Sequence, residues 1–335
     1  MREKVDVTVV IPNYNGMKYI DKCLKSLYEG SVEPKVILID NGSTDGSAEL
    51  AEKNYPLCRL VRFTENRGFC RAVNEGIRLA ETEYVILLNN DTAVDKEFIF
   101  RLWKAIQKRK NAFSVSAKML SMQNPELIDD AGDLYCALGW AFALGKGKSR
   151  TLYTKPAEIF ASCAGAAIYR RSVFDVIGYF DENHFAYLED IDIGYRARIS
   201  GFSNYFEPSA IVYHAGSAVS GSRHNKFKVR LSARNSVYLL YKNMPVFQIF
   251  LNLFFAVAGI LIKAVFFAGK GLGGTYLKGI AEGVRLCMSE KGRKQKVRFR
   301  PECIGNYVKI QMELWGNMLR AADLFPFLWK IKLYF

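Results

Sequence analysis

The first 220 residues alternate short apolar runs with longer segments whose apolar positions recur at helical spacing. The short runs predict strands at residues 7–11, 35–39, 59–63, 84–88, 163–169 and 211–213. The segments between them predict helices at residues 18–28, 47–53, 68–80, 95–109 and 189–199. Strands that alternate with helices are typical of an α/β fold with a mostly parallel sheet and helices on both faces.

Two later regions lack this alternation. Residues 120–160 are less periodic and predict loops with a hairpin, whereas the chain from residue 221 to 242 is basic and predicts a helix. An apolar run at 246–262 follows, interrupted only by Gln248 and Asn252. We therefore predict two domains, at residues 1–221 and 222–335.

The charge of the chain supports this division. The chain has 335 residues and a net charge of +14. Residues 1–220 hold 27 basic and 28 acidic side chains, whereas residues 221–335 hold 20 basic and 5 acidic ones, a net of +15. Such asymmetry indicates binding to nucleic acid or to an anionic membrane. The basic part lacks the aromatic pattern and the helix-turn-helix signature of nucleic-acid binders, so we predict the membrane.

Cysteine and histidine usage argues against a zinc site or a disulfide framework. Seven Cys lie scattered without a CxxC pair, and the chain has three His. This usage favours a reducing compartment. The sequence passes directly into a predicted strand with no signal peptide, so we expect a cytoplasmic location.

Polar side chains follow three of the predicted strands at the point where each strand ends. They begin at Pro12 after the first strand, at Asp40 after the second and at Asn89 after the fourth. Each cluster alone could be an ordinary turn. In an open parallel sheet, however, the carboxyl ends of the strands form one edge, where ligands bind. No GxGxxG or GxxxxGK[ST] motif is present, so the glycine-rich routes to nucleotide binding are not supported.

Four segments together resemble glycosyltransferase family 2, and most closely its rhamnosyltransferase-like branch. They are Val9-Val10-Ile11-Pro12-Asn13-Tyr14-Asn15, Ile39-Asp40-Asn41-Gly42-Ser43-Thr44-Asp45-Gly46-Ser47, Asn66-Arg67-Gly68-Phe69 and Leu87-Leu88-Asn89-Asn90-Asp91-Thr92. The resemblance covers about residues 5–220. It implies a GT-A fold and a nucleoside-diphosphate sugar as the donor.

The resemblance also implies roles for individual residues. The residues expected at the nucleotide are Pro12, Asn13, Asn15, Asp40, Arg67, Gly68, Asn74 and Asn90. Asn89-Asn90-Asp91 takes the place of the family's Asp-x-Asp metal motif, which leaves Asp91 as the carboxylate ligand for Mg²⁺ or Mn²⁺. His214, after the last predicted strand, is expected to complete the metal site, although a lone His is more often structural.

The segment from Glu189 to Asp192 places three carboxylates at the start of a predicted helix. They could simply complement the helix dipole, and Asp192 could pair with Arg196 one turn later. In the family, the Glu-Asp doublet supplies the catalytic base. The resemblance therefore implies that Asp190 takes the proton of the acceptor hydroxyl and that Glu189 orients the acceptor.

Together these features predict an inverting, metal-dependent glycosyltransferase. The acceptor is expected to be lipid-linked or a polysaccharide, in cell-surface glycan synthesis, with rhamnose as one candidate sugar. The alternative is a membrane-attached protein that binds a nucleotide sugar without turnover.

The apolar run has three interpretations: a membrane span, a helix lying in one leaflet, or a core helix of a small C-terminal bundle. Residues 246–262 number 17 before Lys263, which is at the lower limit for a span. We predict a monotopic arrangement on the cytoplasmic face, with Arg230, Arg234, Lys242 and the tract 291–300 at anionic head groups.

Overall fold

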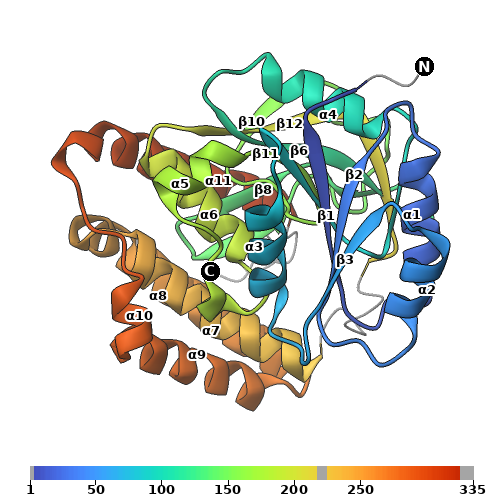
Figure 1. The fold of residues 1–335 in the computed structure, drawn as a ribbon. Coiled ribbons are helices and arrows are strands. Elements are labelled where there is room, and N and C mark those ends of the chain that lie inside the picture. Colours follow the sequence, from blue (N-terminus) through green and yellow to red (C-terminus); the bar gives the residue numbers. More distant parts are fainter. Residues whose placement is uncertain (1–3, 217–224, 325–335) are drawn as a thin grey trace. The chain divides into compact units, whose positions relative to one another are not determined.

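The computed structural model describes residues 4–216 and 225–324, and it contains a mixed ten-stranded sheet (Figure 1). The strand order is β10-β12-β6-β11-β4-β1-β2-β3, with β5 paired to β12 and β7 paired to β6. The strands are β1 (Val7–Asn13), β2 (Lys35–Asp40), β3 (Cys58–Arg62), β4 (Tyr84–Leu88), β5 (Thr92–Val94), β6 (Ala112–Ser121), β7 (Ile128–Asp130), β10 (Ala157–Ile159), β11 (Ala166–Arg170) and β12 (Ser203–His214).

The direction of the strands decides which loops meet. The pairs β1–β2, β2–β3 and β1–β4 are parallel. β11 runs antiparallel to both β4 and β6, and β6 is parallel to β12. The strands β1, β2, β4, β6 and β12 therefore all point the same way, and their carboxyl ends share one edge of the sheet.

Helices cover both faces of this sheet. On one face α1 (Ile20–Tyr28), α2 (Ser47–Asn54) and α4 (Phe98–Gln107) enclose one apolar core, and on the other α3 (Phe69–Leu79), α5 (Arg171–Ile177) and α6 (Glu189–Ile199) enclose a second. Successive strand residues serve opposite cores, because side chains alternate across a sheet. Thus Val9 belongs to the first core and Val10 to the second, and both are fully buried.

The predicted α/β class is confirmed, and the main difference lies in the middle of the chain. The sequence predicted no element at residues 112–119, but β6 is a ten-residue strand between β11 and β12. Its sequence, AFSVSAKMLS, carries Ser and Lys among the apolar residues, yet its first nine residues are buried. Hydrogen bonds to strands on both sides stabilise it, and its composition alone does not reveal this.

The chain divides into two compact units. The first comprises residues 1–133, 143–197 and 202–223, and the second comprises residues 134–142, 198–201 and 224–335. The predicted boundary near residue 221 lies outside the described residues. The second unit thus includes two short segments from the middle of the chain besides the C-terminal helices.

Helices make up most of the second unit. They are α7 (Lys226–Asn243), α8 (Val246–Ala268), α9 (Gly273–Met288), α10 (Glu290–Lys294) and α11 (Ile304–Leu324). There are also two short 3₁₀ helices: η1 (Glu182–His184) lies in the first unit and η2 (Pro301–Cys303) in the second. Glycines let α9 approach α7 closely. A Cβ added at Gly279 or Gly283 would lie 2.3 Å from the Arg230 carbonyl oxygen or 2.6 Å from that of Arg234.

The helix α8 buries its polar and small side chains. Gln248, Asn252, Ala256 and Gly259 are buried, at spacings of four, four and three that place them on one face of the helix. The Gln248 and Asn252 amides both donate to Oε1 of Gln311 on α11, at 3.2 and 2.8 Å. At Gly259 a Cβ would lie 2.2 Å from the Leu138 carbonyl oxygen, in the turn between β8 (Asp133–Cys136) and β9 (Trp140–Ala143).

The opposite face of α8 exposes large apolar side chains. Phe250, Phe254 and Val265 are 74%, 79% and 74% exposed. Among the described residues, α8 is the one helix long and apolar enough to cross a membrane, with a mean hydropathy of 2.3, and only 17% of its most apolar stretch is buried. The interpretation of this segment as a core helix is therefore wrong.

Candidate functional site

Asn13 connects three of the strand ends at the carboxyl edge of the sheet. Its side chain is fully buried at the end of β1. The amide nitrogen donates to Asp40 Oδ1 at the end of β2, at 3.0 Å, and to the Ser47 hydroxyl at 2.9 Å. Its oxygen accepts from the Asn90 amide after β4, at 2.7 Å. Three predicted site residues from three strands are thus in direct contact.

The loop after β1 is fixed to the loop after β2. Asn15 adopts a positive φ of 49° and accepts from the Thr44 backbone at 3.0 Å, while its own backbone N–H donates to the Ser43 hydroxyl. Asp40 is buried and accepts from the Ser43 backbone at 3.2 Å. Pro12 lies in β1 directly before Asn13 and is half-buried.

Asn41 holds the Arg67–Gly68 segment at the same edge. Its side-chain oxygen accepts from the Arg67 backbone at 2.8 Å, and its amide donates to the Gly68 carbonyl at 3.2 Å. Gly68 has a φ of +86°, and a Cβ there would lie 2.6 Å from the Phe185 ring. Only glycine fits this position, and the Arg67 side chain remains exposed next to it.

Asn74 lies deeper than the other predicted nucleotide contacts. Its amide donates to the Phe180 carbonyl at 2.8 Å, and its oxygen accepts from the Phe180 backbone at 3.0 Å. The side chain is 1% exposed. Both of its polar atoms are thus engaged by the segment before η1, and its role at the nucleotide stays a prediction.

Asp91 and His214, the predicted metal ligands, meet across the pairing of β5 with β12. His214 lies opposite Thr92 in this pairing, directly beside Asp91. The distance from His214 Nε2 to Asp91 Oδ1 is 3.2 Å. His214 Nδ1 lies 2.7 Å from Asp129 Oδ2, and Asp129 Oδ1 lies 2.6 Å from Lys146 Nζ.

The charges of Asp91, His214, Asp129 and Lys146 influence one another. Burial alone would lower the pKa of His214, but its hydrogen bonds to Asp129 and Asp91 raise that pKa to about 9. Burial would raise the pKa of Asp129, but its bonds to His214 and Lys146 hold it well below the usual range. The protonated, positively charged form of His214 is therefore favoured beside Asp91.

Glu189 and Asp190 are the first two residues of α6, and the backbone directly before them is strained. Phe185, Tyr187 and Leu188 all have positive φ, between 63° and 70°. Such conformations cost of the order of 1–3 kcal/mol each for non-glycine residues and cluster at functional sites. Asp192 accepts from Arg196 at 2.9 Å, as the spacing predicted. This confirms the structural interpretation of Asp192 and leaves Glu189 and Asp190 as the candidates for chemistry.

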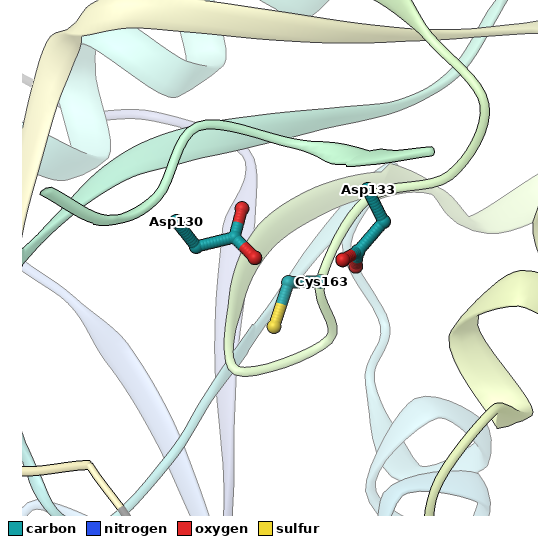
Figure 2. A group of neighbouring side chains, drawn as sticks. All are labelled: Asp130, Asp133 and Cys163. Carbon is teal, nitrogen blue, oxygen red and sulfur yellow. The ribbon is translucent and has the colours of Figure 1, made fainter. Parts of the chain in front are cut away.

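The sequence analysis missed a second group of acids beside Asp190. Figure 2 shows the carboxyl groups of Asp130 and Asp133 turned toward each other with the Cys163 side chain next to them, and the ligand atoms of the three residues lie within 4.8 Å of each other. Asp133 is also hydrogen-bonded to Asp190. The segment Asp129-Asp130-Ala131-Gly132-Asp133 was visible in the sequence, but its acids had no strand or motif to place them.

Burial disfavours the charged forms throughout this group. It raises the pKa of Glu189 to about 8, with Asp190 adding to the effect, and the pKa of Asp130 to about 7. Burial, Asp130 and Asp190 raise the pKa of Asp133 well above its usual range. Burial also raises the pKa of Asp190 and of the Cys163 thiol. This pattern is typical of acids that share protons.

Comparisons with known proteins agree with this geometry. The model of "Glycosyl transferase family 2" matches residues 8–178. The N-acetylglucosaminyl-diphospho-decaprenol L-rhamnosyltransferase of Mycobacterium tuberculosis is 30% identical over 234 residues, which are 62% of this chain and 75% of that protein. The poly-beta-1,6-N-acetyl-D-glucosamine synthase of Staphylococcus epidermidis is 24% identical over 211 residues, 62% of this chain and 49% of that protein.

Solved structures share the fold at low sequence identity. GalNAc-T7 with UDP, GalNAc and Mn²⁺ superposes with a TM-score of 0.56 at 17% identity, covering 70% of this chain and 47% of that chain. The mannosyltransferase PcManGT from Pyrobaculum calidifontis, with GDP-Man and Mn²⁺, gives 0.53 at 16% identity, covering 91% and 86%. The fold is therefore GT-A, and the chain is a glycosyltransferase that belongs to glycosyl transferase family 2, in its rhamnosyltransferase-like branch.

Proposed function

We propose that this glycosyltransferase is an inverting enzyme that moves a sugar from a nucleoside diphosphate to a hydroxyl of a lipid-linked or polysaccharide acceptor. The observation that carries the proposal is the presence of two groups of titratable side chains in the first unit. Asp91 faces His214 at the carboxyl edge of the sheet, and Asp190 opens α6 with a raised pKa.

The nucleotide pocket in this proposal is the hydrogen-bonded edge around Asn13. Asp40 accepts from the base or the ribose, and Pro12, Asn13, Asn15 and Asn90 shape the walls. The exposed Arg67 lies beside Gly68, whose lack of a side chain lets Phe185 pack closely against it. Such contacts form before the chemistry starts, so they hold the donor rather than accelerate transfer.

The residues at the carboxyl edge fit a divalent cation. Asp91 offers an oxygen and His214 a nitrogen, and these two atoms face each other at 3.2 Å. With Nδ1–H donated to Asp129, a metal ion that replaced the proton on Nε2 would find the lone pair of this atom directed toward Asp91. Mg²⁺ or Mn²⁺ bound by Asp91 and His214 would neutralise the departing diphosphate, and Mg²⁺ accepts few protein ligands because it keeps several waters.

The chain's own residues handle the proton. Asp190 takes it from the acceptor hydroxyl as the oxygen bonds to the anomeric carbon and the sugar's bond to the diphosphate breaks. Proton transfer to a positioned side chain contributes about 10²–10⁴-fold to the rate. Glu189, buried next to Asp190, orients the acceptor in this proposal.

The relative from Mycobacterium tuberculosis is named for a lipid-diphosphate-linked N-acetylglucosamine acceptor and for L-rhamnose. We propose a substrate of the same class here, an acceptor sugar on a lipid diphosphate, with rhamnose as the first donor sugar to test.

The test is a donor screen with dTDP-rhamnose, UDP-glucose, UDP-galactose and GDP-mannose, with and without Mn²⁺ and a lipid-diphosphate-linked N-acetylglucosamine. We expect nucleoside diphosphate release that needs the acceptor and stops with chelator. The product linkage should have the inverted anomeric configuration. Donor binding without any release would favour the binding-only alternative, and activity that is insensitive to chelator would contradict the metal site.

We further propose that the second unit attaches the enzyme to the cytoplasmic face of the membrane in a monotopic manner. The exposed apolar face of α8 is joined by a stripe on α11: Ile304, Val308, Met312 and Leu319, all at least 45% exposed. Exposed basic residues of the tract 291–300 flank Phe299, which is 44% exposed. Apolar faces with nearby basic side chains are typical of helices that lie in a membrane interface.

The set of basic residues differs from the predicted one. Lys242 is 2% exposed, so it is not available to head groups. Arg230 forms an ion pair with Glu282 at 2.6 Å. The tract 291–300 therefore supplies most of the positive charge in this proposal. We expect the protein to float with vesicles that contain phosphatidylglycerol, salt to release only part of it, and detergent to release all of it. Complete release by salt alone would contradict insertion of the apolar faces.

A further inference from the structure

The Asp133 and Asp190 side chains are hydrogen-bonded to each other, and both are held on rigid backbone. Asp133 begins β8, where its backbone N–H donates to the Ala161 carbonyl at 3.1 Å and its carbonyl accepts from the Ala161 N–H at 3.2 Å. Asp190 lies in the first turn of α6, and its Oδ1 accepts from the Ile191 backbone at 2.7 Å. The pair therefore has a fixed geometry.

Two carboxyl groups at hydrogen-bond distance need a proton between them, because two carboxylates would repel and neither could donate. The surroundings place that proton on Asp133. Asp133 is 9% exposed, and within the described part of the chain its Oδ2 has no hydrogen-bond partner. A charged carboxylate with an unpartnered buried oxygen is costly, whereas a neutral carboxyl is much less so. Asp190, in contrast, accepts a backbone hydrogen bond.

We propose that Asp133 is a positioning residue: its protonated carboxyl donates a hydrogen bond to Asp190 and holds that side chain as an oriented anion. The inference rests on the proposed role of Asp190 as the base. In the reaction, Asp190 receives the proton of the acceptor hydroxyl while Asp133 keeps its own. The acceptor oxygen bonds to the anomeric carbon, and the diphosphate leaves with the electron pair of the broken bond.

Several other groups act on this pair and set its titration. Asp130 comes from β7, Cys163 from the loop before β11, Tyr169 from β11 and Glu189 from α6. Lys146 is the cation that acts on Asp133. The acids and the thiol all disfavour a second negative charge at Asp133, and the raised pKa of Asp133 is consistent with this.

The test compares Asp133→Asn with Asp133→Ala. The Asn amide still donates to Asp190, so it should keep kcat within about threefold of wild type and leave the acid limb of the kcat/KM profile within about 0.3 pH units. The Ala variant removes the donor. We expect kcat to fall about 10–100-fold, with the donor KM unchanged, and the acid limb to move up by about one pH unit, because a buried carboxylate without its donor is harder to ionise.

Three outcomes would overturn the inference. Equal losses in the Asn and Ala variants would mean that Asp133 acts as an anion, for example toward a cation. Equal activity of the Ala variant and wild type would mean that Asp190 needs no partner. A fall in activity without a shift of the pH profile, together with a lower melting temperature, would indicate a purely structural role.

Controls separate these outcomes from failure of the proposed function. Asp175→Asn, on an exposed turn of α5, should leave every parameter unchanged. If Asp190→Asn retains wild-type turnover, the proposed base is wrong. If Asp190→Asn is inactive while both Asp133 variants match wild type, only the inference about Asp133 fails.

Discussion

A strand of the first unit, β1, and a helix of the second unit, α8, bury opposite kinds of side chain. In the first unit, both faces of β1 are apolar and fully buried, as Val9 and Val10 show. In the second, α8 buries Gln248 and Asn252 against α11 and exposes Phe250 and Phe254. The first pattern is that of a domain stabilised by removing apolar surface from water. The second leaves large apolar side chains of α8 exposed.

In the proposed function, each unit has a distinct role. Among the polar groups that the first unit buries are those at the carboxyl edge of the sheet, which form hydrogen bonds to each other, as Asn13 does with Asp40 and Asn90. An edge of this kind is where α/β sheets bind ligands. The second unit offers apolar stripes and basic side chains instead. We therefore expect substitutions in the first unit to change catalysis, and those on the α8 face to change location.

The largest expected effect is that of Asp190→Asn. The change keeps the shape of the side chain and removes only the proton acceptor, so kcat should fall about 10²–10⁴-fold. The donor KM and attachment to vesicles should stay as in wild type. Turnover above a tenth of the wild-type value would show that Asp190 is not the base.

Asp91→Ala should come next, with loss of both activity and Mn²⁺ dependence. Its carboxylate lies 3.2 Å from His214 and is the one acid of the Asn89-Asn90-Asp91 turn. His214→Ala should act more mildly and raise the Mn²⁺ concentration needed for half activity. Superimposable Mn²⁺ titrations for wild type and His214→Ala would remove the histidine from the metal site.

The comparison of the two units can be tested directly with Phe254→Glu and Leu57→Glu. Both residues are strongly exposed, at 79% and 74%, but Phe254 lies on α8 and Leu57 lies in the first unit. Because burying one such side chain contributes about 1.5–3 kcal/mol, Phe254→Glu should weaken vesicle binding about tenfold or more. Leu57→Glu should not change it. Equal effects of the two variants would contradict attachment through the α8 face.

The sequence best predicted the strands and helices whose apolar residues recur at regular spacing. The alternation of apolar runs and helical segments predicted β1 to β4 and α1 to α4 within a few residues, because each of these elements has its own buried stripe. It did not predict β6, since Ser114, Ser116 and Lys118 interrupt the apolar pattern. Those polar groups are paired only through the fold: Ser114 with Asn204, and Lys118 with the Leu152 carbonyl.

The candidate site shows the same limit. Asp91 and Asp190 stood in recognisable segments, whereas Asp129 and Asp133 lay in a stretch without periodicity. Both residues join the candidate site through a contact that is distant in sequence. Asp129 contacts His214, and Asp133 contacts Asp190. The face of α8 that would be buried was likewise undecided until Gln248 and Asn252 were placed against Gln311.

A smaller effect is expected at the nucleotide edge of the first unit. Asp40→Ala should raise the donor KM about tenfold and lower kcat less, because its contacts are made equally in the ground and transition states. Since Asp40 also accepts from Asn13, the melting temperature should be measured alongside. A fall in kcat with an unchanged KM would move Asp40 from donor binding toward the chemistry.

The smallest expected effect is on stability, at Glu189. Burial and Asp190 raise the pKa of Glu189 to about 8, above the ordinary value of about 4.5 that it has in the unfolded chain. The folded protein therefore binds more protons than the unfolded chain between these two values, and its stability falls as the pH rises from about 4.5 to 8. Glu189→Gln removes this contribution, so its melting temperature should match wild type near pH 5 and exceed it near pH 8, by about 2–4 °C for each kcal/mol. The matched control is Glu33→Gln, at an exposed carboxylate before β2, which should show no such difference. If the gap between Glu189→Gln and wild type stays constant from pH 5 to pH 8, the buried acids of the first unit do not hold extra protons, and the contrast between the two units rests on apolar burial alone.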